Sequence, residues 1–318
     1  PASFFEREPP RLVLECFACG RPDWFEALLF DEKRAERRLI VDLEYLSAEP
    51  WVEDFHLMPS LTRSPSVAKA LFMPGFTART GGLILDRDFM EARARYASPS
   101  RLPERRAFLE SLGSAAPRAG LSPKAEERFW ISVFSYERDY ARVVADLAAY
   151  ERERPLLALI AAGKSAPCFF EAWERLGRPF PAIALPFLPQ TRWDEALLAS
   201  DFAIVRGEDS LSRAVLSGRP FLWQAYPQAD KQQLVKVKAL LALMGPRFRP
   251  EDAGPLEALF LAFNDRLEDS ADCRGGESLL PVLRASEALA PAFASFSQSV
   301  LGCGNLVLPL LTLLRDFV

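Results

Sequence analysis

The stretch that decides the fold is Asp201-Phe202-Ala203-Ile204-Val205-Arg206-Gly207-Glu208-Asp209-Ser210. Its first half is a short apolar run that predicts a buried strand, and the residues that follow it, 211–216, predict the first turns of a helix. Ser217-Gly218 then supplies a helix end. Arg206–Ser210 therefore occupy a strand-to-helix turn, which in open α/β sheets lies at the carboxyl ends of the strands, where ligands bind.

The chemistry of this turn favours a nucleotide or sugar-phosphate pocket. Gly207 lets a ligand approach the backbone, and the helix start offers unpaired N–H groups and a positive dipole end. Arg206 adds a forked positive charge. Glu208 and Asp209 would repel phosphate, so we expect them to accept from sugar hydroxyls or to cap the helix. In the alternative interpretation, Asp209 or Ser210 is only a helix cap and Arg206 is a surface charge.

The composition is that of a globular protein of about two domains. The chain has 318 residues, of which 49% are hydrophobic and 26% charged. A net charge of −4 without a long basic run argues against nucleic-acid binding. No apolar run reaches the ~20 residues of a membrane helix, and the first residues carry no signal-peptide pattern. These features predict a protein of the cytoplasm without membrane contact.

The five cysteines and the single histidine limit the possible chemistry. Cys16 and Cys19 have CxxC spacing, but no second pair completes a zinc site, so two small apolar residues at a strand end are the favoured interpretation. Histidine-ligated metals and Ser-His-Asp or Cys-His catalysis are disfavoured unless His56 itself serves. We therefore expect acid–base work to fall to a carboxylate.

Strands and helices alternate regularly from Trp130 onward. Each of five predicted strands is followed by a predicted helix, which indicates a parallel, doubly wound domain. The predicted strands are 131–135, 156–160, 183–185, 202–205 and 220–223, and the helices are 140–150, 168–176, 193–199, 211–216 and 231–243. Residues from Gly254 onward predict helices, including a packed helix at 306–314.

The residues before Trp130 predict a smaller, incomplete α/β domain. Its expected elements are strands at 11–17 and 38–43, a helix at 22–29, loops at 44–49 and 56–60, and short apolar runs at 71–73 and 83–85. So few strands make a poor sheet, and we expect the front of this domain to be missing from the chain. The charged, proline-containing residues 91–128 predict a helical linker.

The predicted fold class is α/β and GT-B-like, with two Rossmann-like domains facing a cleft. The predicted domains are 1–125, on the acceptor side and with its front missing, and 126–318, on the nucleotide-sugar side. Some dehydrogenases share this plan. However, no GxGxxG motif follows any predicted strand, which counts against a dinucleotide cofactor.

Nine short blocks of sequence occur in an order that one known family shares. They are Phe17-Ala18-Cys19, Glu44-Tyr45-Leu46-Ser47-Ala48-Glu49, His56-Leu57-Met58-Pro59-Ser60, Gly81-Gly82-Leu83-Ile84, Leu185-Pro186-Phe187-Leu188-Pro189-Gln190, Val205-Arg206-Gly207-Glu208-Asp209-Ser210, Arg213-Ala214, Gly218-Arg219-Pro220-Phe221 and Tyr226-Pro227-Gln228. From about Leu12 to its last residue the chain resembles the protein-arginine rhamnosyltransferases that modify elongation factor P, the EarP family. Any one block alone would be a weak signal, but together they are highly specific.

The resemblance implies an inverting GT-B glycosyltransferase. Such an enzyme moves L-rhamnose from dTDP-β-L-rhamnose onto an arginine side chain of translation elongation factor P, and it needs no metal or other cofactor. The implied partners are this nucleotide sugar and elongation factor P. The donor nucleotide would bind in the C-terminal domain.

The resemblance also assigns the residues of the donor site. Phe187 and Gln190 would contact thymine, and Trp193 stands where the family has another aromatic residue near the base. The residues placed around the ribose and pyrophosphate are Tyr136, Arg206, Glu208, Asp209 and Ser210, with Arg206 on the diphosphate that leaves.

The aromatic residues of this set have an alternative interpretation that involves no ligand. Stacking on a base contributes about 1–3 kcal/mol for each aromatic ring. Core packing is the alternative, and it is stronger for Phe187, which lies in an apolar run, than for Trp193, which has polar neighbours. Tyr136 ends a predicted strand, so its ring can reach the cleft, or it is a half-buried surface tyrosine.

Two departures from the family stand out. Gln224 lies two residues before Tyr226, where the family usually shows histidine. The family's Asp-Asn-x-Gly-Asp-x-Gly block, the source of its proposed general base, does not occur in the chain. A guanidinium nitrogen is a poor nucleophile unless a carboxylate takes its proton. No residue here is assigned that role, and Glu44 and Glu49 are interpreted as structural or acceptor-side.

Two hypotheses about function follow. The first is an arginine rhamnosyltransferase that lacks its base in this chain, and for which we expect donor binding without transfer. The second is a non-catalytic nucleotide-sugar or protein-binding module, a degenerate relative that has kept the donor pocket.

Overall fold

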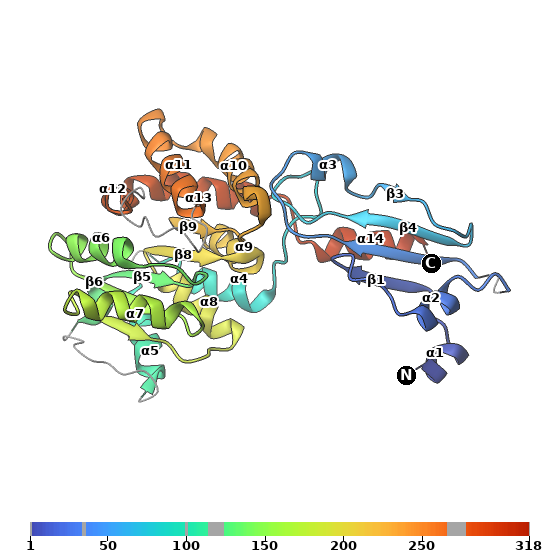
Figure 1. Ribbon diagram of the computed structural model, residues 1–318, viewed down its shortest axis with the longest axis horizontal. Helices are drawn as coiled ribbons and strands as arrows, with labels where there is room; N and C mark the ends of the chain where they lie inside the picture. Colours follow the sequence, from blue (N-terminus) through green and yellow to red (C-terminus); the bar gives the residue numbers. More distant parts are fainter. Residues whose placement is uncertain (1, 34–35, 99–100, 114–123, 266–277, 318) are drawn as a thin grey trace. The chain divides into compact units, whose positions relative to one another are not determined.

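The computed structural model describes residues 2–33, 36–98, 101–113, 124–265 and 278–317 (Figure 1). The chain forms two compact units: unit 1 comprises Pro1–Leu85 with Val300–Val318, and unit 2 comprises Asp86–Ser299. This division differs from the predicted domains 1–125 and 126–318 at both ends of unit 2. Packing at residues 86–113 and 300–317 accounts for the difference.

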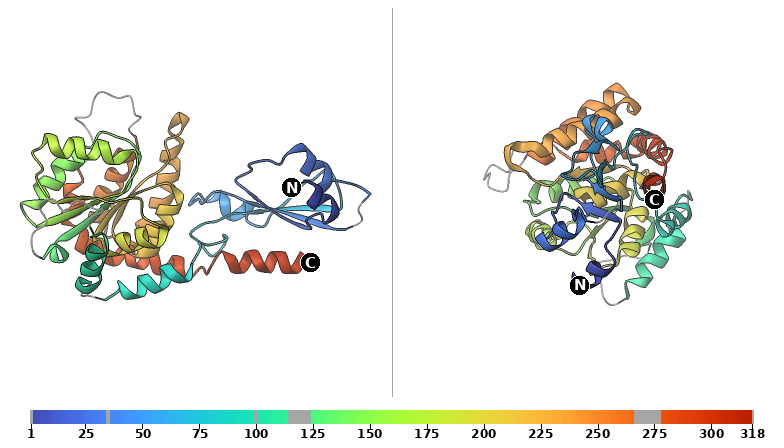
Figure 2. Two further views of the ribbon diagram at one scale, coloured as in Figure 1. Left: turned by 90° about the horizontal axis from the view of Figure 1, so that it is seen from below. Right: turned by 90° about the vertical axis from the view of Figure 1, so that its right-hand side faces the viewer.

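Unit 2 is built on a parallel sheet, and its α/β class is as predicted. The strands are β5 (Phe129–Val133), β6 (Leu156–Ile160), β7 (Ala182–Ala184), β8 (Phe202–Arg206) and β9 (Phe221–Gln224), in the order β7-β6-β5-β8-β9. Every residue of β5 and β6 is buried. Such continuous burial is expected of a parallel sheet with helices on both faces, which Figure 2 shows.

The helices of unit 2 confirm the predicted alternation. They are α6 (Ala141–Glu151), α7 (Ser165–Arg175), α8 (Gln190–Ala199), α9 (Gly207–Ser217), α10 (Gln232–Met244), α11 (Pro250–Asp265), α12 (Leu280–Arg284) and α13 (Ser286–Leu301), with 3-10 turns at Ala125–Glu127, Ala229–Lys231 and Gly245–Arg247. Three helices begin earlier than predicted: α7 at Ser165 instead of 168, α8 at Gln190 instead of 193, and α9 at Gly207 instead of 211. Residues Glu208–Ser210 therefore lie in the first turn of α9.

The predicted linker is helical within its described residues, but it packs as part of unit 2. It contains α4 (Arg87–Arg95) and α5 (Leu102–Ser111). The Arg105 side chain on α5 is buried, and its Nε and Nη2 donate to the Ala199 carbonyl at 2.8 and 2.7 Å. Nη2 also pairs with Asp201 at 2.7 Å. These contacts tie α5 to the C-terminal sheet, so the boundary lies before α4.

Unit 1 holds a smaller sheet. Its strands are β1 (Leu12–Cys16), β2 (Arg38–Leu43), β3 (Pro59–Ser60) and β4 (Val67–Phe72), in the order β1-β2-β4-β3, and its first helices are α1 (Ala2–Arg7), α2 (Asp23–Leu29) and α3 (Trp51–Phe55). β1, β2 and β4 are parallel, whereas β3 is antiparallel to β4. The apolar run at 83–85 forms a single bridge, between Leu83 and Asn305, rather than a strand.

The last helix, α14 (Val307–Phe317), completes unit 1. Leu306 joins Leu39, Val41 and Phe72 in a buried cluster, against which the apolar side chains of α14 pack. Figure 2 shows the ribbon of α14 running beside the sheet of unit 1. The connection is fixed by a hydrogen bond of 2.8 Å from the Leu306 N–H to the Leu83 carbonyl. The predicted packed helix at 306–314 is thus present, and it covers the N-terminal sheet.

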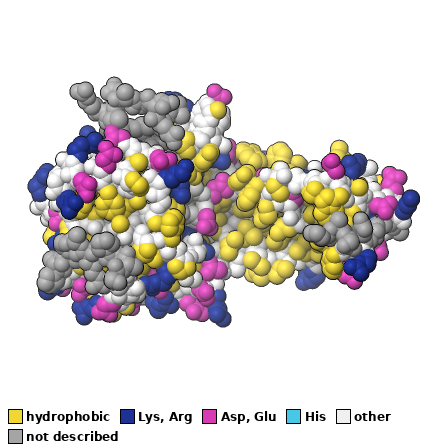
Figure 3. Space-filling model, turned by 60° about the horizontal axis from the view of Figure 1, so that its bottom comes forward, with side chains coloured by type: hydrophobic (Ala, Val, Ile, Leu, Met, Phe, Trp, Pro, Cys, Tyr) yellow, Lys and Arg dark blue, Asp and Glu magenta, His cyan; other side chains and the backbone are white. Residues whose placement is uncertain are grey.

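Most of the large hydrophobic side chains that are exposed lie in unit 1, where Figure 3 shows them gathered. They include Leu14 on β1, Phe17 and Tyr45. The rings of Phe17 and Tyr45 stack with their centroids 4.4 Å apart. Among the described residues, no helix combines the length and the apolar character that crossing a membrane requires.

Candidate functional site

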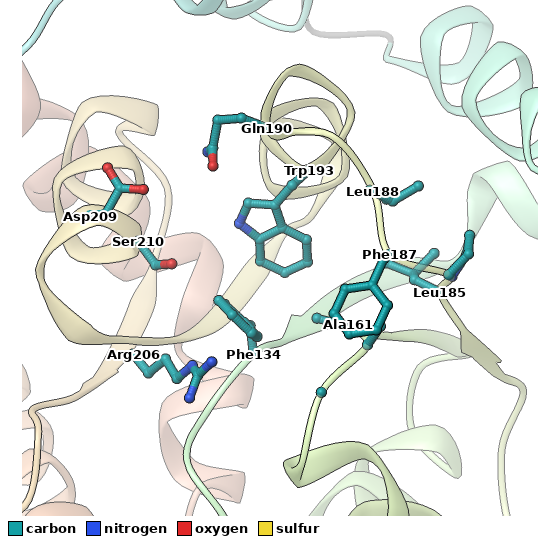
Figure 4. A pocket seen from close by; sticks show the side chains of 13 residues that line it. Phe134, Ala161, Leu185, Phe187, Leu188, Gln190, Trp193, Arg206, Asp209 and Ser210 are labelled. Atoms are coloured by element: carbon teal, nitrogen blue, oxygen red, sulfur yellow. The ribbon is translucent and has the colours of Figure 1, made fainter. Parts of the chain in front are cut away.

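A pocket of about 360 Å³ lies where four parallel strands of unit 2 end (Figure 4). Its lining includes Phe134 after β5, Ala161–Gly163 after β6, Leu185–Leu188 after β7 and Arg206 at the end of β8. β6 and β7 lie on one side of β5, whereas β8 and β9 lie on the other. The pocket is therefore at the topological switch point, where α/β sheets bind ligands.

The structure brings most of the predicted donor-site residues together. Those that line the pocket are Phe187, Gln190, Trp193, Arg206, Asp209 and Ser210. Tyr136 and Glu208 do not line it. Tyr136 contacts the Arg206 side chain, and the Glu208 carboxylate is 3.9 Å from the Lys236 ammonium. Both therefore stand beside the pocket.

The local structure explains why residue 207 is a glycine. Its φ is +62°, a conformation that favours glycine, and a Cβ added there would lie 3.2 Å from the Tyr136 hydroxyl. Its carbonyl accepts a hydrogen bond of 2.7 Å from the Trp223 indole. The close approach that the sequence predicted for a ligand at Gly207 is thus already made, in part, by a tyrosine.

The Arg206 side chain is held by two aromatic rings. Its guanidinium carbon lies 4.4 Å from the centroid of Phe134 and 4.8 Å from that of Tyr136. Such contacts attract the cation to the ring faces. The Tyr136 backbone N–H donates to Gln224 Oε1 at 2.9 Å, so the buried Gln224 side chain helps to place this tyrosine. Burial raises the pKa of the Tyr136 phenol, which therefore stays neutral near pH 7.

The first turn of α9 carries no side-chain cap. The N-cap residue is Arg206 in an extended conformation, and its side chain makes no capping hydrogen bond. Asp209 and Ser210 lie inside the helix, so the alternative in which one of them is the cap is wrong. The helix start thus offers uncapped donors and its positive dipole end beside Arg206, an arrangement that suits an anion.

The exposure of the two candidate base-stacking aromatics is the reverse of what the sequence predicted. Phe187 is 88% exposed, whereas Trp193 is 8% exposed and packs against Phe134. β7 ends at Ala184, so Phe187 lies on a proline-flanked loop and not in the core. Core packing is therefore the better description of Trp193, and Phe187 has the free ring. The Trp193 Nε1 is buried without a partner among the described residues.

A buried carboxylate supports the pocket from behind Gln190. Gln190 Nε2 donates to Asp194 Oδ1 at 2.8 Å, and Arg213 Nε is 3.7 Å from the same oxygen. Burial raises the pKa of Asp194 to about 6, against the opposing effect of Arg213. Sequence reasoning missed Asp194 and Phe134. The available signals were the i,i+4 spacing of Asp194 from Gln190 and the position of Phe134 at a strand end.

The acidic residues of the N-terminal blocks have local partners. The Asp42 carboxylate is 2.7 Å from the Lys69 ammonium, and Glu49 accepts from the Ser47 hydroxyl at 3.0 Å. Burial and the nearby Asp42 raise the pKa of Glu44. Within the described residues, no three His, Cys, Asp or Glu side chains are grouped as a metal site.

The structure also describes His56 and four of the five cysteines. His56 Nδ1 accepts the Met73 N–H at 3.2 Å, and burial lowers the pKa of the imidazole. Cys16 and Cys19 are free thiols, as are Cys168 and Cys303. Cys273 lies outside the described residues.

The fold and the pocket define an α/β protein of two units on largely parallel sheets, with a ligand pocket at the switch point of the second. The sequence matches the family model described as "Elongation-Factor P (EF-P) rhamnosyltransferase EarP" over residues 2–314. The chain belongs to the EarP family.

Individual relatives agree with this assignment. A protein-arginine rhamnosyltransferase of Shewanella oneidensis is 33% identical over 274 residues, which cover 80% of this chain and 66% of that protein. One from Pseudomonas aeruginosa is 33% identical over 264 residues, with the same coverage of 80% and 66%. The chain thus spans just under two thirds of the length of these relatives.

A solved structure concerned with EarP-mediated arginine glycosylation of translation elongation factor EF-P has the same fold. It aligns with 96% of this chain and 99% of its own, at a TM-score of 0.60 and 22% identity. The predicted α/β fold class is confirmed.

Proposed function

We propose that this chain carries the donor-binding unit of a protein-arginine rhamnosyltransferase. The donor is dTDP-β-L-rhamnose, the acceptor is an arginine of translation elongation factor P, and transfer inverts the sugar without a metal. Membership of the EarP family supports the reaction. The observation that carries donor binding is Arg206, held between Phe134 and Tyr136 at the uncapped start of α9.

Each part of the donor has a matching group in the pocket. Thymine stacks on the exposed ring of Phe187, and Gln190 meets the edge of the base. The diphosphate lies on Arg206 and the first N–H groups of α9. Glu208 carries the wrong charge for phosphate, so it accepts from ribose hydroxyls at the rim.

The reaction defines what these groups must do. A guanidinium nitrogen of the acceptor attacks C1 of rhamnose from the face opposite the diphosphate, the C1–oxygen bond breaks, and its electron pair stays on the diphosphate. The proton from the nitrogen passes to a base. Arg206 stabilises the charge that grows on the departing diphosphate, and such stabilisation speeds the chemical step.

Calorimetric titration tests the site first. dTDP is expected to bind the 318-residue chain, and Phe187→Ala is expected to weaken binding about 5- to 150-fold through loss of stacking. Val235→Ala, at another exposed apolar side chain of unit 2 outside the pocket, is the matched control. Absence of dTDP binding to folded protein at millimolar ligand would contradict the proposal.

A transfer assay then tests whether the chain itself transfers rhamnose. The chain, dTDP-β-L-rhamnose and elongation factor P are incubated, and the mass of the acceptor arginine is measured. Rhamnosylated acceptor establishes the transferase and directs the search for a base to Asp42, Glu44 and Glu49. Donor binding without transfer is expected both of a transferase that lacks its base in this chain and of a non-catalytic nucleotide-sugar-binding module.

A further inference from the structure

We propose that Asp194 determines base specificity by positioning Gln190, so that the pocket reads the keto–imide edge of thymine and rejects the amino–imine edge of cytosine. This inference rests on the proposed nucleotide ligand and adds a residue that does not itself touch it. Gln190 is the first residue of α8, and Asp194 follows one helical turn later. The amide and the carboxylate are joined by the 2.8 Å hydrogen bond from Nε2 to Oδ1.

Charge sets the orientation of the Gln190 amide. An ionised carboxylate has acceptors only, so the amide must turn its Nε2 toward Asp194. The flipped amide would bring its own oxygen against the carboxylate oxygen, which leaves a buried acceptor unpaired and adds repulsion. The amide therefore has one stable orientation as long as Asp194 is an anion.

The surroundings keep Asp194 an anion at neutral pH in spite of its burial. Its side chain is 3% exposed, and Arg213 Nε is 3.7 Å from Oδ1. Arg213 also pairs with Asp86, at the start of α4, and Asp209 on α9 is the other nearby carboxylate. An i,i+4 pair that served only to stabilise a helix would gain nothing from such burial.

A fixed amide can match only one of the two pyrimidine edges. After Nε2 has given one hydrogen to Asp194, the amide still presents an acceptor, Oε1, and a second N–H. Thymine offers an N3–H donor between two carbonyl acceptors, whereas cytosine offers an N3 acceptor beside an amino donor, which is the reverse order. An amide free to rotate by 180° could serve either base. Figure 4 shows the Gln190 amide directed away from α8, on the side where Asp209 lies.

The test is the ratio of dissociation constants for dCDP and dTDP, measured by calorimetry on the 318-residue chain. We expect the wild type to prefer dTDP on the order of 10- to 100-fold, the effect of one or two mismatched hydrogen bonds. Asp194→Asn keeps the size of the side chain but can donate or accept, so the preference is expected to fall to a few-fold. Gln190→Ala should lose the preference as well, and the double variant should lose no more than either single variant.

Glu195→Gln is the matched control. It removes the next carboxylate of α8, which pairs with Arg192 and Arg95 and not with Gln190. An unchanged preference in Asp194→Asn, or an equal loss of preference in Glu195→Gln, would overturn this inference but not the proposed function. Failure of the wild type to bind dTDP would instead overturn the proposed function. Asp194→Leu removes the acceptor altogether and repeats the test. Circular dichroism and the melting temperature, compared with those of the wild type, show that this variant is folded.

Discussion

Arg206 and Glu208 stand two residues apart but face different parts of the proposed donor. Arg206→Ala is expected to weaken dTDP binding by about 1.5–3 kcal/mol, because a charge-assisted contact is lost, and to leave thymidine binding unchanged. Glu208→Ala should weaken both ligands, since each contains the ribose. Calorimetry of both variants with both ligands measures this. Equal losses for thymidine and dTDP in Arg206→Ala would show that Arg206 does not bind the diphosphate.

Asp194 also has a consequence for stability. Because its folded pKa is raised to about 6 from 3.8, the folded state binds the proton more tightly than the unfolded state. Ionisation of Asp194 therefore destabilises the fold above pH 6, and the cost disappears as the pH falls toward 4. Asp194→Asn removes this effect. We expect its melting temperature to gain on the wild type as the pH rises from 4 to 7, and a difference independent of pH would contradict the pKa.

Among single residues, the sequence predicted that Arg206 and Gly207 lie where a strand passes into a helix, but not the exposure of the aromatics. Arg206, Gly207 and the helix start are local features, which follow from a strand, a glycine and a helix in succession. Exposure of Phe187 depends on where β7 ends, and burial of Trp193 depends on Phe134 across the sheet. Such long-range packing leaves no local signal in the sequence.

Helix α5 belongs to unit 2 because of one buried arginine. Arg105 donates to the carbonyls of Ala199, Glu126 and Arg128 and pairs with Asp201. Arg105→Ala is expected to lower the free energy of unfolding by about 1–3 kcal/mol, because it removes the donor to these carbonyls, whereas Asp201 keeps Arg101 as a partner. Denaturant titration measures this loss.

The neighbouring Arg106 is the natural control for Arg105. It lies on the same helix, its side chain is 64% exposed, and its partner is Glu126. Arg106→Ala should leave the unfolding midpoint almost unchanged, because an exposed ion pair contributes little. If both variants lost stability equally, the anchoring role of Arg105 would be refuted.

Elements were the most predictable level of this structure. All five βα pairs of unit 2 follow from apolar runs alternating with amphipathic ones, and β6 was predicted with its observed bounds, Leu156–Ile160. The helical character of α4 and α5 was predicted, but not their attachment, since charged residues with prolines resemble a linker. The sequence does not reveal that Arg105 is buried until Ala199 and Asp201 are placed beside it.

The division into two units has a consequence for ligand-linked stability. A ligand that binds only the folded state stabilises what it binds, by about 2.7 kcal/mol at a hundred times its dissociation constant. We therefore expect dTDP to slow hydrogen exchange in β5 and β8 of unit 2 and to leave β2 and β4 of unit 1 unchanged. Mass spectrometry of peptides from these strands provides the measurement. Protection confined to unit 1 would show that dTDP binds to unit 1, and would contradict the proposed site in unit 2.

Domain boundaries were harder to predict than strands. The predicted boundary at 125 followed composition, whereas the observed units follow packing: residues 86–113 join the sheet after them, and residues 300–317 return to the sheet at the start of the chain. Return of the chain to an earlier sheet is a tertiary event. Its only trace in the sequence is the apolar character of the last helix.

The return of α14 also sets an order of events during synthesis. Unit 2 is a single uninterrupted segment, so all its residues are translated before Val307–Phe317. The strands of unit 1 are made before unit 2, yet Leu39, Val41 and Phe72 cannot be covered until Leu306 and α14 arrive. At translation rates of roughly 5–20 residues per second, these apolar strands wait many seconds without their cover. Until then the nascent chain exposes these apolar strands, which chaperones can bind.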